Sequence, residues 1–173
     1  MDQNVIQVGS DLELRTAAES DFAAVCHWFL SVKLATTSEA NSFIRQWAGP
    51  NITYPCSVEQ LASHLVAGQY QSFVLAEHAN IIGFGQIQLV KQRAHLARLA
   101  INPIYRGQGH AKRLLAELIE NARQKIELKE VSLFVHLENT TAIACYEKFG
   151  FAESAPPTGI NTVAGCRFMT LRY

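Results

Sequence analysis

The stretch from Leu99 to Leu115 constrains the fold of this chain more than any other. It predicts an apolar strand at Leu99–Ile101, a turn at Asn102-Pro103, and a helix that opens with the glycine-containing segment Arg106–Ala111. Glycines just before a helix let backbone N–H groups converge on a phosphate, at a point where the helix dipole already favours negative charge. The stretch therefore predicts a site for a diphosphate group.

Length and composition predict a globular protein with one domain over residues 1–173. A chain of 173 residues can bury an independent core, and 49% hydrophobic with 17% charged residues is typical of a globular protein. The formal net charge is zero. The chain as a whole therefore has no electrostatic basis for binding nucleic acid or an anionic membrane.

The local distribution of charge differs from this neutral total. No acidic residue lies between Glu77 and Glu117. Basic residues in that interval could be a chance run on a solvated face or could attract an anionic ligand, and their overlap with the glycines favours the ligand. They are Lys91, Arg93, Arg98, Arg106, Lys112 and Arg113.

Cysteine usage and the N-terminal sequence predict a soluble, cytoplasmic protein. The N-terminus lacks a basic region and an apolar signal core, and no apolar run reaches membrane-spanning length. The scattered cysteines form no C-x-x-C pair and no metal-binding spacing, so we expect reduced thiols and no metal site. They are Cys26, Cys56, Cys145 and Cys166.

Hydrophobic periodicity predicts one strand and three helices in the first part of the chain. Leu12–Arg15 alternates like a half-buried strand, and Ser20-Asp21 can cap an amphipathic helix. Ser38–Trp47 favours a second helix. Ser57–Gln60 forms a capping box for a third helix, which should end at Gly68.

Three consecutive strands are predicted next, at Ser72–Glu77, Ile81–Val90 and Ala94–Ile101. Gly83 and Gly85 in the second of them indicate a bulge or a close backbone neighbour. The third strand is apolar on both faces except at two positions, so it should be central in the sheet.

The amphipathic helix from Ala111 to Ala122 then leads to a buried strand at Val131–Leu137, which we expect to be parallel to the strand before the glycines. Another helix should run from Asn139 to Phe149. The closing strands are predicted at Phe151–Glu153 and Cys166–Tyr173. We therefore expect an α/β fold of the α+β type, with a mixed, mainly antiparallel central sheet flanked by helices.

A second motif follows the predicted parallel strand. Asn139 begins a helix, Tyr146 follows seven residues later, and the helix closes in Phe149-Gly150-Phe151. Together with the Arg-x-x-Gly-x-Ala pattern from Arg106 to Ala111, this motif resembles the GNAT superfamily of N-acetyltransferases. The resemblance extends from about Leu12 to Phe151 and implies the acyl-CoA N-acyltransferase fold, with acetyl-CoA as cosubstrate and no metal.

The resemblance also implies how acetyl-CoA is held. Backbone groups of the strand before the loop would pair with the pantetheine arm, and one N–H would hold the acetyl carbonyl oxygen. Amides of the loop would hold the pyrophosphate, with charge added by the first and last of its side chains. The implied cofactor-binding residues are Leu99, Ala100, Ile101, Arg106, Gly107, Gln108, Gly109, His110, Ala111, Lys112, Asn139 and Tyr146.

The implied reaction is direct attack of a primary amine on the thioester through a tetrahedral intermediate. Tyr146 would be the general acid that protonates the departing thiolate, because a tyrosine pKa near 10 lies not far above that of a thiol, about 8.5. Many members carry a glutamate in the strand before the loop, and this chain has none there. His95, His136 and Glu77 remain open as the general base.

The number of acidic residues in the sequence limits the chemical class of the acceptor amine. Polycationic acceptors usually need several carboxylates, but only Glu39 and Glu59 occur between Asp21 and Glu77. This favours a singly charged amine: an amino acid, an amino-acid derivative or a peptide N-terminus. The region between the first two strands would line the acceptor side, so its aromatic residues are candidate contacts or simply packing residues. They are Trp47 and Tyr54.

Other ligand and function classes fit less well. A P-loop needs Gly-Lys followed by Ser or Thr, and a Rossmann fingerprint needs Gly or Ala at the position of Lys112. A non-catalytic acyl-CoA sensor would keep the loop, but the presence of Tyr146 argues against it. An RNA-binding module lacks interleaved aromatic residues. The sequence leaves the acceptor, the base and a homodimer open.

Overall fold

The computed structural model describes residues 11–30, 44–49 and 51–173. Its centre is a seven-stranded sheet with the order β1-β2-β3-β4-β5-β7-β6. The strands are β1 (Leu12–Thr16), β2 (Gln71–Glu77), β3 (Asn80–Val90), β4 (Arg93–Ile101), β5 (Glu130–His136), β6 (Ala152–Glu153) and β7 (Cys166–Arg172).

Helices flank both faces of the sheet. Residues 44–48 are helical, in agreement with the end of the helix predicted at Ser38–Trp47, whose first part lies outside the described residues. No helix among the described residues is long and apolar enough to cross a membrane. The other helices are α1 (Glu19–Leu30), α3 (Val58–Val66), the short 3-10 helix η1 (Pro103–Tyr105), α4 (His110–Arg123) and α5 (Thr140–Phe149).

The predicted capping box of α3 is confirmed. The Gln60 N–H donates to Ser57 Oγ at 3.2 Å, and the Ser57 N–H donates to Gln60 Oε1 at 2.8 Å. The helix ends at Val66, and Gly68 follows with φ +99°. A φ in this left-handed region is easiest for glycine, so the predicted stop signal is explained by backbone geometry.

The pairing of the strands confirms a mixed, mainly antiparallel sheet. Within the described chain every strand pair is antiparallel except β4 with β5. These two run parallel, and α4 makes the crossover between them, because parallel neighbours need a long connection. The prediction of a strand parallel to the one before the glycines is therefore confirmed.

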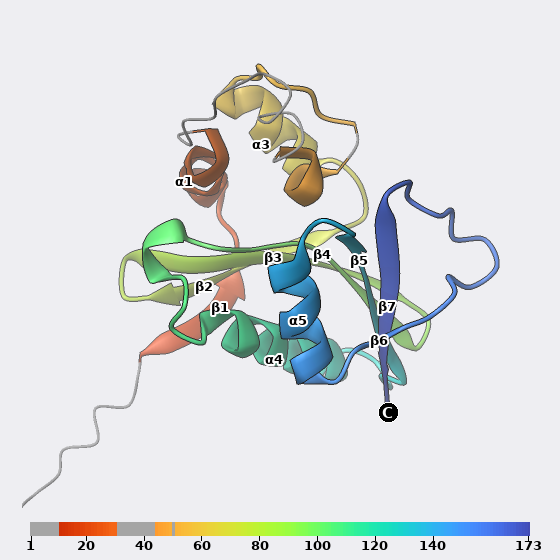
Figure 1. The fold of residues 1–173 in the computed structure, drawn as a ribbon. Coiled ribbons are helices and arrows are strands. Elements are labelled where there is room, and N and C mark those ends of the chain that lie inside the picture. Colours follow the sequence, from red (N-terminus) through yellow and green to blue (C-terminus); the bar gives the residue numbers. More distant parts are fainter. Residues whose placement is uncertain (1–10, 31–43, 50) are drawn as a thin grey trace, which may run out of the picture.

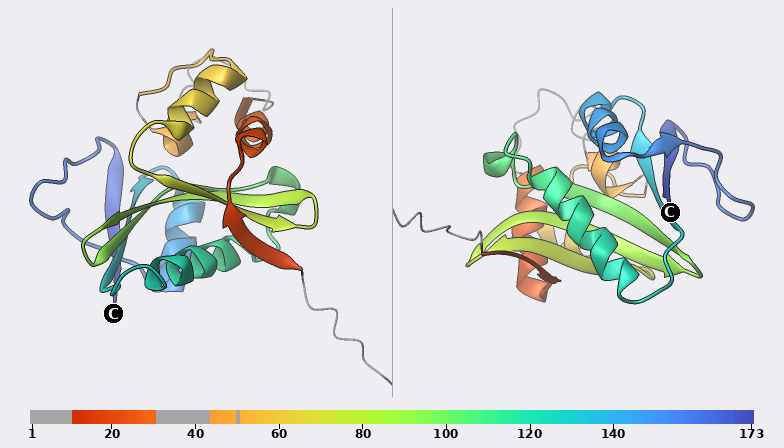
Figure 2. Two further views of the ribbon diagram at one scale, coloured as in Figure 1. Left: turned by 180° about the vertical axis from the view of Figure 1, so that it is seen from behind. Right: turned by 90° about the horizontal axis from the view of Figure 1, so that it is seen from below.

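Helices lie on both sides of the sheet (Figure 1), and each face has its own hydrophobic core. On one face, α1, α3 and residues 44–48 pack around Phe84 of β3. On the other face, α4 and α5 pack around residues such as Leu96 of β4. Figure 2 shows α4 running across the strands and α5 beside β5 and β7. The predicted apolar stripe of α4 is confirmed, with Leu114, Leu115, Leu118, Ile119 and Ala122 buried.

A β-bulge interrupts the pairing of β3 with β4, as the glycines of β3 predicted. Phe84 pairs with Ala100 and Gln86 pairs with Ala97, so Gly85 alone lies opposite two residues of β4. A Cβ on Gly85 would lie 2.7 Å from Leu118 Cδ1 of α4. The missing side chain therefore lets the crossover helix pack closely on the bulged strand.

Candidate active site

The segment between β4 and α4 has the backbone geometry of an anion-binding loop. Gly107 has φ +76° and Gly109 has φ +83°. A Cβ at either position would meet no atom within 4 Å, so the positive φ rather than crowding calls for glycine. Gly109 caps α4 without any side-chain cap, which leaves the N-terminus of the helix open to a ligand.

Consecutive amides of this loop are not used within the protein. Among the described residues, the N–H groups of Gly107 to Ala111 find no backbone or side-chain acceptor. Arg106 and Lys112 at the two ends of the loop differ, because their N–H groups donate to the carbonyl oxygens of Pro103 at 3.5 Å and Gly109 at 3.1 Å. The free donors and the dipole of α4 point the same way and favour an anion at the helix start.

The basic residues of the sequence do not gather into one surface around this loop. Lys91 and Arg93 lie at the opposite end of β4, and Arg113 pairs with Glu117 at 2.7 Å. Arg106 and the exposed Lys112 remain beside the loop. The Arg106 Nε donates to the Ile101 carbonyl oxygen at 3.2 Å, which ties the loop to the end of β4.

An open strand edge leads into the loop. The pairing of β4 with β5 covers Arg93–Leu96 and Glu130–Leu133, whereas both strands continue beyond it. Residues Ala97–Ile101 of β4 therefore have no strand partner on the β5 side. The carbonyl oxygens of Arg98 and Ile101 accept from the Trp47 and Arg106 side chains. The remaining backbone groups on this edge can pair with an extended ligand. This stretch includes Leu99, Ala100 and Ile101, which the sequence singled out.

The second motif lies on α5. Asn139 caps this helix, since its Oδ1 accepts from the Ala142 N–H at 3.2 Å. Tyr146 is half-buried, and its ring packs on Phe151 with centroids 5.9 Å apart. Burial raises the pKa of Tyr146 above its ordinary value. The phenol therefore keeps its proton at neutral pH, and its hydroxyl bonds to no other described residue.

The three base candidates lie in different surroundings. His95 is packed between rings of β5 and β7, and burial lowers its pKa to about 4. A base with this pKa takes few protons from an ammonium whose ordinary pKa is about 10.4. Its Nδ1 also lies 2.9 Å from Ser132 Oγ. His136 lies 3.9 Å from the Glu138 carboxylate, and Glu77 lies at the β2–β3 turn.

Sequence reasoning missed a polar network on the α1/α3 face. Gln86 is fully buried, and its Nε2 donates to the Leu65 carbonyl oxygen at 2.7 Å and to Ser72 Oγ at 2.8 Å. Its Oε1 accepts from Arg98 Nη1 at 2.5 Å. The available signal was a glutamine inside an otherwise apolar strand, because a buried amide needs partners.

Trp47 has packing partners on this face. Its ring stacks on Phe29 with centroids 3.7 Å apart, and its Nε1 donates to the Arg98 carbonyl oxygen at 3.0 Å. Of its two predicted roles, these contacts favour packing over acceptor binding. Tyr54, the other aromatic candidate, is half-buried.

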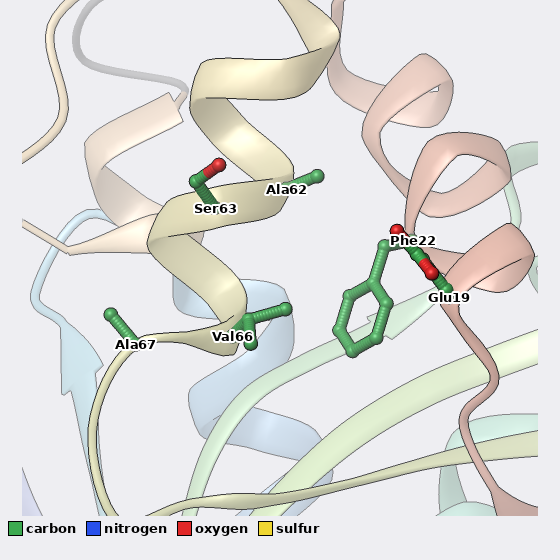
Figure 3. A pocket seen from close by; sticks show the side chains of 6 residues that line it. All are labelled: Glu19, Phe22, Ala62, Ser63, Val66 and Ala67. Atoms are coloured by element: carbon green, nitrogen blue, oxygen red, sulfur yellow. The ribbon is translucent and has the colours of Figure 1, made fainter.

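A separate hollow lies between α1 and α3 (Figure 3). Phe22 of α1 and Val66 of α3 point into it from either side. Its lining also includes Glu19, Ala62, Ser63 and Ala67. The lining contains no residue of the loop, of β4 or of α5, so this hollow is separate from the residues described above.

Comparison with known proteins gives consistent matches. The acetyltransferase (GNAT) family matches residues 38–151. The ribosomal protein bS18-alanine N-acetyltransferase of Escherichia coli is 33% identical over 101 residues, which are 58% of this chain and 67% of the relative. The spermidine N(1)-acetyltransferase of Thermoplasma acidophilum is 29% identical over 116 residues, 65% of this chain and 69% of the relative.

The fold has close counterparts among solved structures. The spermidine N-acetyltransferase from Vibrio cholerae in complex with CoA and spermine superposes with a TM-score of 0.67. The likeness covers 95% of this chain and 96% of that chain at 19% sequence identity. At this identity, the likeness shows a shared fold.

Proposed function

The chain belongs to the acetyltransferase (GNAT) family and is an acetyl-CoA-dependent N-acetyltransferase, and on this premise we propose how its residues hold the cosubstrate and move the acetyl group. The observation that carries the proposal is the open edge of β4 running directly into a loop of unused amides. An extended arm that ends in a diphosphate fits both features at once.

In the proposed complex, the backbone of Leu99–Ile101 pairs with the pantetheine arm and one N–H holds the acetyl carbonyl oxygen. The amides of Gly107–Ala111 hold the pyrophosphate at the start of α4. The Arg106 and Lys112 side chains add positive charge there. Asn139 contacts the arm through the amide nitrogen that helix capping leaves free. CoA in the solved Vibrio cholerae structure supports the same kind of cosubstrate here.

Tyr146 is proposed as the general acid. The neutral acceptor amine forms the new N–C bond, the C–S bond breaks, and the Tyr146 hydroxyl gives its proton to the departing sulfur. The nitrogen loses one proton to solvent as the amide forms, and the Tyr146 phenolate takes one back from solvent. The raised pKa of Tyr146 keeps this proton in place until transfer. The apolar surroundings that raise it also raise the pKa of a thiol held beside the phenol, so the two groups remain matched.

For the acceptor, we propose a singly charged amine of an amino acid, an amino-acid derivative or a peptide N-terminus. The Escherichia coli relative acts on an alanine of a ribosomal protein, whereas the Thermoplasma acidophilum relative acts on spermidine. The scarcity of carboxylates between Asp21 and Glu77 supports the first kind of acceptor. All four cysteines are free, which fits the cytoplasmic location that we also propose.

The test is Tyr146→Phe, with Tyr173→Phe as a matched control at the distant C-terminus. Loss of a general acid should lower kcat by about tenfold or more. The acetyl-CoA-induced rise in melting temperature should remain as in the unmodified protein, since the backbone sites are intact. The control should retain full kcat. An unchanged kcat in Tyr146→Phe removes this residue from the mechanism, and no melting shift with acetyl-CoA contradicts the loop assignment.

A further inference from the structure

Arg98 lies at the bulge of β4, immediately before the residues proposed to hold the pantetheine arm. Its φ is +51°, in a region that a bulky side chain rarely adopts. Arg98 is one of the two residues of β4 that lie opposite Gly85 in the bulge. Its side chain lies on the α1/α3 face, where it contacts Ala48 and Gln86. Unusual backbone geometry of this kind is concentrated at functional sites.

The guanidinium of Arg98 has only neutral partners. Its Nε donates to the Ala48 carbonyl oxygen at 3.2 Å and its Nη1 to Gln86 Oε1 at 2.5 Å. Its Cζ lies 5.4 Å from the centroid of the Tyr70 ring. Within the described part of the chain it forms no ion pair, unlike Arg15 with Asp21 or Arg93 with Glu130.

This arrangement leaves a partly desolvated cation without a counter-charge. Burial lowers the pKa of Arg98, although a guanidinium remains charged at neutral pH. A desolvated cation is unfavourable unless an anion compensates it. No described acidic residue therefore compensates the positive charge of Arg98 on the face of β4 opposite α4.

Part of the guanidinium remains available to a ligand. Nη2 has no hydrogen-bond partner among the described residues, and the Arg98 side chain is half-buried. Nε and Nη1 are anchored, so the planar group is held in one orientation with its free edge open. A fixed guanidinium edge matches a carboxylate, which can accept two parallel N–H bonds.

We propose that Arg98 binds a carboxylate of the acceptor, so that the substrate class is amines that also carry a carboxylate. This inference rests on the proposed function, since it places the acceptor beside the acetyl group held at Leu99–Ile101. The same charge disfavours polyamines, because a second ammonium would face the guanidinium. The carboxylate can belong to a free amino acid or to an acidic side chain near a peptide N-terminus.

The test compares acceptors that differ only in this charge. Alanine, phenylalanine, β-alanine and 4-aminobutyrate are each measured against the corresponding carboxamide, which varies the spacing between amine and carboxylate. Ala-Glu-amide against Ala-Gln-amide tests the peptide source, and spermidine tests the polyamine. For at least one pair, kcat/KM should favour the carboxylate by about tenfold or more. Spermidine should be a poor acceptor.

Substitutions at position 98 test whether Arg98 causes the preference for acceptors that carry a carboxylate. Arg98→Gln should abolish the preference for the carboxylate and leave the KM for acetyl-CoA unchanged. Arg98→Lys should retain part of the preference, because it keeps the charge but loses the planar edge. The matched control is Arg93→Gln, which removes a guanidinium from the same strand at a site with its own carboxylate partner, and it should retain the preference in full.

Several results would overturn the inference. The first is that the carboxamides are used as well as the carboxylates or better, and the second is that spermidine is the preferred acceptor. The third is that Arg98→Gln lowers kcat/KM equally for the carboxylate and the carboxamide. The fourth is that the protein binds acetyl-CoA but acetylates no carboxylate-bearing amine. If Arg98→Gln does not fold, the ratio of kcat/KM between carboxylate and carboxamide acceptors, measured with the unmodified protein and with Arg98→Lys, still tests the inference. Failure of acetyl-CoA to bind would instead contradict the proposed function.

Discussion

The two faces of the central sheet are built from sequence in different ways. On the proposed cosubstrate side, the open edge of β4 and the loop amides come from one segment, Leu99–Ala111. On the proposed acceptor side, Ala48, Tyr70, Gln86 and Arg98 come from four separate segments of the chain. The first side depends on local backbone geometry, and the second depends on buried polar contacts between distant residues.

Because of this difference, we expect that mutations can disrupt acetyl-CoA binding and acceptor binding independently of each other. A backbone change in the loop should affect the cosubstrate and leave the acceptor side folded. A change in the buried network should reduce stability and acceptor binding and leave the loop amides in place.

The largest effect is expected from Gly109→Val. A left-handed backbone is costly for an L-residue and more so for a β-branched one, and a shifted loop loses donors to the phosphates. Together these changes should weaken acetyl-CoA binding by about a hundredfold, or about 3 kcal/mol. Calorimetric titration with acetyl-CoA measures this change.

The control for this variant is Gly159→Val, in the loop before β7. Gly159 has φ +89°, and a Cβ added there would meet no atom within 4 Å, as at Gly109. This variant imposes the same kind of backbone strain away from the site and should bind acetyl-CoA normally. Equal losses in both variants would mean that general destabilisation, not loop geometry, explains the result.

Gln86→Leu should produce the next largest effect, on the acceptor side. It removes the side-chain donor to the Leu65 carbonyl and the Ser72 hydroxyl, and it removes the acceptor of Arg98 Nη1. Unfolding by urea should show a loss of about 2–4 kcal/mol in the free energy of unfolding. The KM for the acceptor should rise more than the KM for acetyl-CoA.

Gln88→Leu is the matched control for that experiment, two residues further along the same strand. Its Nε2 bonds to Gln69 Oε1 at 3.3 Å in an exposed position, so the loss of stability should be within about 0.5 kcal/mol. Equal rises of both KM values in Gln86→Leu would contradict the independence of the two sides.

The smallest predicted effect concerns pH and His95. Its folded pKa of about 4 lies below the ordinary value of 6.5, so the unfolded chain binds more protons between these values. The neutral form therefore supports the fold above pH 6.5, and this support is lost as the pH falls toward 4. From pH 7 to pH 5 the loss should reach about 2 kcal/mol.

Urea unfolding at both pH values checks this prediction. His95→Gln should lose less stability than the unmodified protein over the same interval. His78→Gln, at an exposed turn, is the control and should behave like the unmodified protein. If His95→Gln loses as much stability as the unmodified protein between the two pH values, a group other than His95 causes the acid sensitivity.

Much of the fold followed from sequence, because its signals act between neighbours. The capping box before α3, the apolar stripe of α4 and the left-handed glycines of the loop are each set within a few residues. Even the bulge was indicated, since Gly85 lies in the strand opposite it. The parallel pairing of β4 with β5 followed from the length of the connection between them.

The network around Arg98 could not be predicted in the same way. In the sequence this residue belongs to a run of basic side chains near a suspected phosphate site. In the fold it lies on the other face of the sheet, because the bulge opposite Gly85 redirects one position of β4. Its partner Ala48 is 50 residues away, and no local pattern specifies such a contact.

The sequence by itself determined the backbone of the loop that we propose holds the cosubstrate, since φ preferences and helix-start amides are properties of adjacent residues. The tertiary structure alone decided where the charge of Arg98 lies, which partners surround Gln86, and that His95 is held neutral between aromatic rings. These properties depend on desolvation and on contacts across the sheet. Both arise only when distant segments pack together.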